Sequence, residues 1–218
     1  MLLAHVRYIE GMFHVKHSPE HDELASHLRS FAGAHSLDIS GDAFDALANL
    51  VSWLAPAAHR IGLTKYADPP SLAEHLVCPA LLLLTRDLRP LVSGPVLDFG
   101  AGCGAVGLAV AVIFPCAQIV LADRRRRVVE FLDVAARRHG LHNAEAALVD
   151  LKRPPEPLSG HFGTILVRAY GPPEQALFDA RAWLRPEGVV ALWHQPDVCP
   201  ALDGLNALRT EATDLPSL

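Results

Sequence analysis

The most informative stretch of the 218-residue chain is Val96-Leu97-Asp98-Phe99-Gly100-Ala101-Gly102-Cys103-Gly104-Ala105-Val106-Gly107. The short apolar run at its start predicts a buried strand, and the apolar residues from Ala105 to Phe114 predict a helix. Between them, glycines at alternate positions let the backbone turn sharply and let a ligand touch the main chain. The N-terminus of the following helix offers unpaired N–H groups to a polar ligand. The stretch therefore predicts a strand, a ligand-binding turn and a helix.

Acidic residues accompany three successive predicted strands. Asp98 stands two residues before the first glycine, Asp123 follows the strand at 118–122, and Asp150 follows the strand at 144–149. A carboxylate at the position of Asp123 can accept hydrogen bonds from both hydroxyls of a ribose. The next strand end, at Asp150, is where an adenine edge would lie. The pattern indicates a ligand that contains a nucleoside.

Two cofactor classes fit this loop. The run from Gly102 to Gly107 matches the G-x-G-x-x-G pattern of nicotinamide and flavin dinucleotide sites, with Asp123 about 20 residues further on. The acid-x-Gly-x-Gly-x-Gly form that begins at Asp98 is instead the signature of S-adenosylmethionine methyltransferases. A cationic sulfonium cofactor favours Asp98, whereas a pyrophosphate does not, so we predict S-adenosylmethionine. A turn whose glycines serve packing alone is disfavoured by the acids after three strands. The predicted cofactor-binding residues are Asp98, Gly100, Ala101, Gly102, Cys103, Gly104, Asp123, Asp150 and Leu151.

The sequence pattern changes near residue 92. Before this point apolar residues recur at helical spacing, with one helix beginning at Ser18, a second ended by Pro56 and a third capped by Ser71. After it, apolar strands alternate with helices up to a last strand at Val189–Trp193, which is typical of a doubly wound, mostly parallel α/β sheet. We therefore predict a flexible N-terminus at 1–17, a helical N-terminal extension at 18–92, a cofactor-binding core at 93–196, and a C-terminal tail, native or truncated, at 197–218.

Composition excludes several classes of protein. Half of the residues are apolar and 20% are charged, which excludes wholesale disorder. A formal net charge of −5 excludes a basic nucleic-acid coat and leaves only a local patch for RNA. The longest apolar stretch is far short of the roughly 18–20 residues that span a bilayer, and no signal peptide is visible. The four cysteines form no Cys-x-x-Cys pair, so we expect free thiols in a reducing cytoplasm. We also expect no membrane partner and a monomer.

Further segments give the chain a resemblance to a known family. In chain order around the glycine loop they are Met12-Phe13-His14-Val15-Lys16-His17, Gly62-Leu63-Thr64, Glu74-His75-Leu76, Asp123 with Arg127, Phe131-Leu132, Gly140-Leu141-His142-Asn143, and Phe162 through Arg168-Ala169. Over roughly residues 12–195 the chain resembles the bacterial small-subunit (16S) ribosomal RNA guanine-N7 methyltransferases, also called glucose-inhibited division protein B. The resemblance implies a class I, Rossmann-like methyltransferase fold with a helical N-terminal extension. It also implies S-adenosylmethionine as cofactor and ribosomal RNA or the small ribosomal subunit as partner.

Departures from the family pattern gather near the expected substrate pocket. Asp150 stands where the family has Arg, Trp193 where it has Lys, and Gly163 where it has Asp. Exchanging one cation for an anion and another for a neutral ring shifts the local charge by about three units toward negative, which disfavours a polyanion. These residues leave an alternative open: an S-adenosylmethionine-binding relative with lost or altered rRNA activity, a different substrate or a regulatory role.

Two residues are candidates for the reaction itself. Guanine N7 carries a lone pair and no proton, so its attack on a sulfonium methyl group needs no general base. Arg168, at the end of the fourth strand, is predicted to line the pocket toward both cofactor and substrate. His75 lies in a leucine-rich helix and is either a packed core residue or, as the resemblance implies, a functional one. Cys103 has no base near it in sequence and is expected to pack rather than act as a nucleophile.

The dense basic run is Arg124 to Arg127, and it either contacts RNA phosphates or forms a solvated helix face. Cations at a helix N-terminus oppose the helix dipole, and this unfavourable placement favours a function. The spacing of His14, His17 and His21 suits a metal, but no Cys or acidic cluster joins them, so no metal site is predicted. The predicted RNA-binding residues are Arg124, Arg125, Arg126, Arg127, Arg137 and Arg138.

Overall fold

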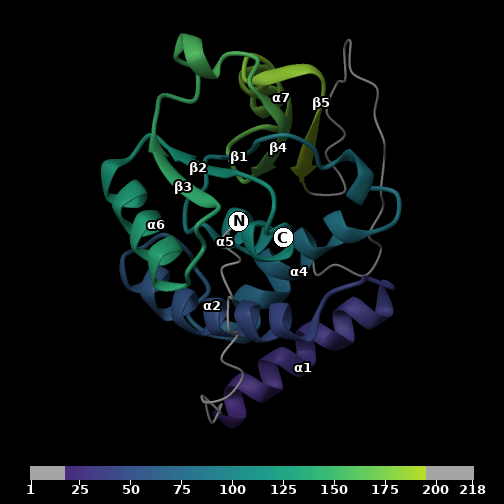
Figure 1. The fold of residues 1–218 in the computed structure, drawn as a ribbon. Helices are drawn as coiled ribbons and strands as arrows, with labels where there is room; N and C mark the ends of the chain where they lie inside the picture. The colour runs from purple at the N-terminus through teal and green to yellow at the C-terminus, as the bar shows by residue number, and fades with distance from the viewer. Residues whose placement is uncertain (1–17, 195–218) are drawn as a thin grey trace, which may run out of the picture.

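The glycine-rich segment leads out of the central strand of a parallel sheet. The computed structural model describes residues 18–194. The sheet order is β3-β2-β1-β4-β5, and each neighbouring pair is parallel (Figure 1). Because the chain moves outward from β1 to β3 and then returns to the other side of β1, the order reverses between β1 and β4, and ligands of such sheets bind at the carboxyl ends of the strands there. The strands are β1 (Val96–Phe99), β2 (Ile119–Asp123), β3 (Ala144–Leu148), β4 (Phe162–Arg168) and β5 (Leu184–Trp193).

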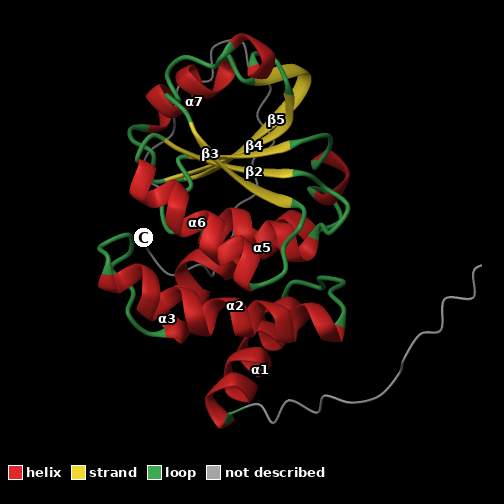
Figure 2. Cartoon of the chain, turned by 60° about the vertical axis from the view of Figure 1, so that its left-hand side comes forward, coloured by secondary structure: helices red, strands yellow, loops and turns green. Residues whose placement is uncertain are grey.

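Helices cover both faces of this sheet, as the doubly wound pattern predicts. Figure 2 shows α7 on one face, α5 and α6 on the other, and the helices of the first half as a further layer with α1 outermost. The helices are α1 (Pro19–Ala34), α2 (Gly41–Arg60), α3 (Pro69–Leu72), the π-helix η1 (Ala73–Val77), α4 (Cys78–Leu81), α5 (Ala105–Ile113), α6 (Arg126–Arg138) and α7 (Pro173–Arg181), with 3-10 turns at Leu82–Leu84, Arg89–Leu91 and Glu156–Leu158. Among the residues described, no helix is long and apolar enough to cross a membrane.

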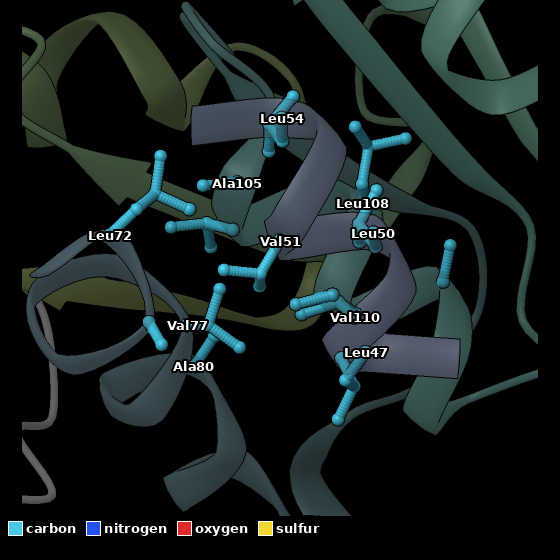
Figure 3. Packing of buried hydrophobic residues seen from close by; sticks show 14 of the residues in the cluster. Leu47, Leu50, Val51, Leu54, Leu72, Val77, Ala80, Ala105, Leu108 and Val110 are labelled. Carbon is cyan, nitrogen blue, oxygen red and sulfur yellow. The ribbon is translucent and has the colours of Figure 1, made fainter. Parts of the chain in front are cut away.

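One continuous core joins the helical first half to the sheet. Leu47, Leu50 and Leu54 of α2 are fully buried and belong to the same cluster as Leu108 and Val110 of α5 (Figure 3). Helix α5 is apolar all round because it lies between the sheet and α2. The helical extension is therefore packed onto the sheet and has no separate core.

Polar caps begin the two long helices. The Ser18 hydroxyl accepts the N–H of His21 at 3.3 Å, which agrees with the predicted start of α1, and the Ser40 hydroxyl accepts the N–H of Ala43 at 3.3 Å. Each such cap stabilises its helix by about 1 kcal/mol. The third cap was predicted wrongly, because the carboxylate of Asp68, not Ser71, caps α3, and it does so by accepting the Ser71 N–H at 2.8 Å.

Two predicted boundaries are also wrong. Pro56 does not end α2, because Leu54 and Ala58, fully buried on either side of it, keep the helix packed although one backbone hydrogen bond is lost. Strand β5 begins at Leu184 rather than at residue 189. The pairing of β4 with β5 shifts register there and Glu187 has a φ of +61°, so the alternation that marks a strand in sequence is broken.

Candidate cofactor and substrate site

The loop between β1 and α5 turns at three glycines. The φ angles of Gly100, Gly102 and Gly104 are +81°, +55° and +79°, a region that other residues rarely adopt. The Gly100 N–H donates to the Ala122 carbonyl at the end of β2 at 3.0 Å. A Cβ on Gly104 would collide with Leu132 of α6, whereas a Cβ on Gly102 would meet nothing closer than its own loop at 3.8 Å. Open space therefore lies at Gly102, where the sequence predicts the cofactor.

Asp98 lies in β1, two residues before Gly100. Its side chain is buried, and Oδ2 accepts the N–H of Gly107 in the first turn of α5 at 2.9 Å. Burial raises the pKa of Asp98 to about 7, against the opposing effect of the Gly107 hydrogen bond. A Cβ on Gly107 would collide with Asp98 and with Leu121 of β2, so this glycine allows α5 to pack closely on the sheet. The geometry makes Asp98 a residue that positions the loop.

Asp123 lies at the end of β2, and its side chain is only 4% exposed. Its Oδ1 accepts the backbone N–H of Arg125 at 2.9 Å and Nε–H at 3.0 Å, while Oδ2 accepts Nη2–H of Arg125 at 3.0 Å and the N–H of Gly102 at 3.3 Å. Burial alone would raise the pKa of Asp123, but the hydrogen bonds and charge of Arg125 outweigh it and hold this pKa below its ordinary value. An ionised carboxylate thus borders the open space at Gly102.

Tyr170 and Leu151 flank the glycine loop on its other side. A Cβ on Gly100 would come within 2.9 Å of the Tyr170 ring and 3.7 Å of Leu151. Leu151 is buried, and its carbonyl accepts the Trp183 Nε1–H at 2.9 Å, while Asp150 beside it is exposed. Sequence reasoning missed Tyr170, and the only available signal was its place directly after the family-like segment that ends β4.

Arg168 ends β4 with a partly buried guanidinium. Burial lowers the pKa of Arg168, and the nearby Tyr66 and Cys103 oppose that shift. Within the described part of the chain the Arg168 side chain has no hydrogen bond or ion pair. Burial raises the pKa of Cys103 to about 11, so its thiol is protonated and a poor nucleophile, as predicted. The free donors of Arg168 are available to an anionic ligand.

His75 lies on the π-helix η1, a kind of turn that is frequent at functional sites. Its ring stacks on Tyr66, with 4.8 Å between ring centroids and 17° between planes, and its Nδ1 is buried without a hydrogen-bond partner. Tyr66, which sequence reasoning also missed, stacks on His75 and acts electrostatically on Arg168.

The six predicted RNA-binding arginines lie at opposite ends of α6. With 1.5 Å of rise per residue, Arg126 and Arg138 are separated by about 18 Å along the helix. Arg138 lies over the Trp53 ring at 5.6 Å and lines a groove of about 720 Å³ remote from the glycine loop. Arg127 donates to the Ile61 carbonyl and Arg137 pairs with Asp133. Arg124 and Arg126 are exposed and have no hydrogen bond or ion pair with the residues described.

Several known proteins that are similar to this chain share one description. The family described as GidB, rRNA small subunit methyltransferase G, matches residues 44–194. The chain belongs to this family. Ribosomal RNA small subunit methyltransferase G of Novosphingobium aromaticivorans is 32% identical over 164 residues, which cover 71% of this chain and 69% of the relative. The protein of the same name from Halorhodospira halophila is 24% identical over 182 residues, 84% of each chain.

Other matches are shorter. The Prochlorococcus marinus methyltransferase G is 35% identical over 83 residues, so this chain spans only 34% of that relative's length. Among solved structures, coclaurine N-methyltransferase bound to N-methylheliamine and SAH superposes with a TM-score of 0.48 at 17% identity, over 79% of this chain and 57% of that chain. The class I methyltransferase fold of this GidB-family chain therefore rests on its sheet order and its family.

One expected pocket residue of this GidB-family chain is placed elsewhere. Gly163 lies near the start of β4, at the amino edge of the sheet, and Arg168 is five residues further along, about 17 Å away. A Cβ on Gly163 would collide with the backbone of Ser93. The prediction that Gly163 belongs to the substrate pocket is wrong, because the glycine serves close backbone packing.

The other two departures do lie at the carboxyl edge. Trp193 is opposite Arg168 in the pairing of β4 with β5, and its Nε1–H donates to the Pro79 carbonyl at 3.3 Å. Asp150 is exposed just beyond β3. His14 and His17 lie outside the described residues, and within 18–194 no group of three or more His, Cys, Asp or Glu side chains is placed to hold a metal.

Proposed function

We propose that the chain is an S-adenosylmethionine-dependent methyltransferase acting on N7 of a guanine in small-subunit ribosomal RNA. The observation that carries the proposal is the open loop at Gly102 beside the ionised Asp123, in a chain that belongs to the GidB family. The family's description supplies methyl transfer to small-subunit rRNA. The guanine N7 position comes from the resemblance described above.

The residues present fit this cofactor. The space at Gly102 accommodates a ligand lying against the main chain, and Asp123 would hold the ribose hydroxyls. Asp150, Leu151 and Tyr170 would border the adenine. When bound, the cofactor supplies a methyl group on a positively charged sulfur.

The chain's own side chains need to bind and orient rather than to move a proton. Because guanine N7 carries no proton, His75 is not required as a base, and its ring is held in a stack on Tyr66. The unpaired guanidinium of Arg168 would hold an anionic group, either a carboxylate of the cofactor or an RNA phosphate. Rate enhancement then comes from holding the two reacting atoms in line in a pocket with little water.

A second candidate function keeps cofactor binding without the rRNA reaction. Two residues favour it. Trp193 stands where the family has a flexible cation, and its indole N–H is hydrogen-bonded to the Pro79 carbonyl. Asp150 adds an exposed negative charge. We further propose that the chain is a cytoplasmic monomer, with 18–92 as the helical extension and 93–196 as the cofactor-binding core. Its tail, at 197–218, lies outside the described residues.

One experiment separates the two candidates. Small ribosomal subunits from cells lacking the gene are incubated with the full chain and methyl-labelled S-adenosylmethionine, and the digested RNA is analysed by mass spectrometry for N7-methylguanosine. We expect incorporation that Gly102→Val abolishes and that subunits from intact cells do not accept. No incorporation into subunits or naked RNA, while S-adenosylhomocysteine still raises the melting temperature, would support the second candidate.

A further inference from the structure

We propose that the Arg125 side chain holds the carboxylate that would bind the ribose, and that cofactor binding releases its guanidinium to contact RNA. The inference rests on the proposed function and names how its two ligands are coupled. It assigns to Arg125 a role distinct from that of its neighbours Arg124 and Arg126.

The acceptor capacity of Asp123 is already filled. A carboxylate has about four lone-pair sites, and Asp123 accepts four hydrogen bonds, three of them from Arg125. Two ribose hydroxyls each need an acceptor. A ribose therefore binds Asp123 only if two of the present donors leave.

The side chain of Arg125 is the part that can leave. The N–H groups of Arg125 and Gly102 belong to the backbone of α6's start and of the glycine loop, and moving them would disturb both elements. The Nε and Nη2 donors of Arg125 belong to a side chain that is 55% exposed and is held by no other hydrogen bond or ion pair with the described residues. Rotation of this one side chain frees one acceptor position on each oxygen.

The released guanidinium enters a basic surface. Arg125 lies between Arg124 and Arg126, both exposed and both without an ion pair to the described residues. While Asp123 holds it, the Arg125 guanidinium has its Nε and Nη2 donors engaged, and once released it can pair with a phosphate. Each phosphate neutralised steepens the dependence of log affinity on log salt by about 0.7 to 0.9.

The strength of the Arg125–Asp123 ion pair limits how strongly cofactor binding and RNA binding can be coupled. Pairs with one partner this exposed change an equilibrium constant by about two- to fivefold. By linkage, S-adenosylhomocysteine tightens RNA binding by the same factor that RNA tightens S-adenosylhomocysteine binding. The pair can therefore couple the two ligands only by about two- to fivefold.

The test measures binding, without turnover. Binding of a fluorescent small-subunit rRNA transcript to the full chain is titrated at several salt concentrations with and without S-adenosylhomocysteine, and S-adenosylhomocysteine binding is measured by calorimetry. For the unmodified chain we expect S-adenosylhomocysteine to tighten RNA binding about two- to fivefold and to steepen the salt dependence by about 0.7 to 0.9. Arg125→Gln should bind S-adenosylhomocysteine about two- to fivefold more tightly and lose the effect of S-adenosylhomocysteine on RNA.

Arg126→Gln is the matched control. It removes the neighbouring charge without touching Asp123, so it should weaken RNA binding while keeping both the coupling and the affinity for S-adenosylhomocysteine. If S-adenosylhomocysteine binds but leaves RNA binding unchanged, or if the two variants behave alike, the inference is wrong while the proposed function stands. If S-adenosylhomocysteine does not bind the unmodified chain, the proposed function fails and the inference with it.

Discussion

Gly102 is the residue at which cofactor binding and backbone strain can be separated by experiment. Gly102→Val places a side chain in the open space and should abolish the rise in melting temperature that S-adenosylhomocysteine gives the unmodified chain by mass action. A positive φ makes any side chain at this position cost about 1–3 kcal/mol of stability as well. Differential scanning fluorimetry with and without millimolar S-adenosylhomocysteine measures both effects.

Gly140 supplies the control for that strain. Its φ is +64° and a Cβ there would meet nothing within 4 Å, but it follows the far end of α6. Gly140→Val should lose a similar amount of stability and keep the full ligand-induced shift. If Gly102→Val keeps the shift as well, the ligand does not occupy the space at Gly102.

Asp98 should make the stability of the chain depend on pH. Its pKa of about 7 in the folded state exceeds the ordinary 3.8, so the folded chain holds this proton more tightly than the unfolded chain. The free energy of unfolding therefore loses a contribution as pH rises from about 4 to about 7. Asp98→Asn keeps an acceptor for the Gly107 N–H but carries no charge. Between pH 5 and pH 8 the melting temperature of the unmodified chain should therefore fall by at least about 3 °C more than that of Asp98→Asn.

Asp38→Asn is the matched control, because the Asp38 side chain is 98% exposed. It should reproduce the pH profile of the unmodified chain. Parallel profiles for Asp98→Asn and the unmodified chain would show that Asp98 is ionised in the folded state across this range.

At the scale of elements, helix α5 packs closely on the sheet because residue 107 is a glycine. A Cβ on Gly107 would collide with Asp98 of β1 and Leu121 of β2, so Gly107→Ala should destabilise the chain by about 1–3 kcal/mol. Gly33, in α1, has nothing within 4 Å of its Cβ position, and Gly33→Ala should stabilise the chain by about 0.5–1 kcal/mol. Urea denaturation measures both changes. Equal effects of the two substitutions would mean that α5 can move away from the sheet without loss.

Local patterns in the sequence were sufficient to predict most of the elements. The run from Val96 to Gly107 predicted β1, the loop and α5 because apolar periodicity and glycine spacing are local signals. The end of α2 was missed because burial, a tertiary property, overrides Pro56. The start of β5 was missed because its register shift depends on pairing with β4.

The candidate site was less predictable for the same reason. Asp123 and Arg168 could be singled out because strand ends in such sheets carry ligand-binding residues. The position of Tyr170 beside Gly100 and the packing role of Gly163 depend on how separate elements meet. No spacing rule in one sequence contains that information.

At the scale of the whole molecule, the layers give the chain two distinct ends. The carboxyl edge of the sheet holds Gly102, Asp123 and Arg168, whereas α1 is the outermost helix on the side away from α7 (Figure 2). With a formal charge of −5, the chain as a whole repels RNA. The position of a charge on the molecule should therefore affect RNA binding more than the net charge does.

Charge reversal at the two ends tests this expectation. Asp150→Arg changes the charge by two units at the carboxyl edge, and Glu23→Arg makes the same change on the exposed face of α1. If the carboxyl edge binds RNA, Asp150→Arg should tighten binding of a small-subunit rRNA transcript severalfold at fixed salt and steepen the salt dependence by about 0.7, while Glu23→Arg changes both little.

Trp193 is left intact because its indole N–H is hydrogen-bonded to the Pro79 carbonyl and a Lys there would lose that packing. Asp150→Asn, which keeps an acceptor for the Lys152 N–H, should give an intermediate affinity. Equal tightening by both reversals would show that RNA responds to net charge alone, and tight binding by the unmodified chain at physiological salt would show that Asp150 does not oppose it.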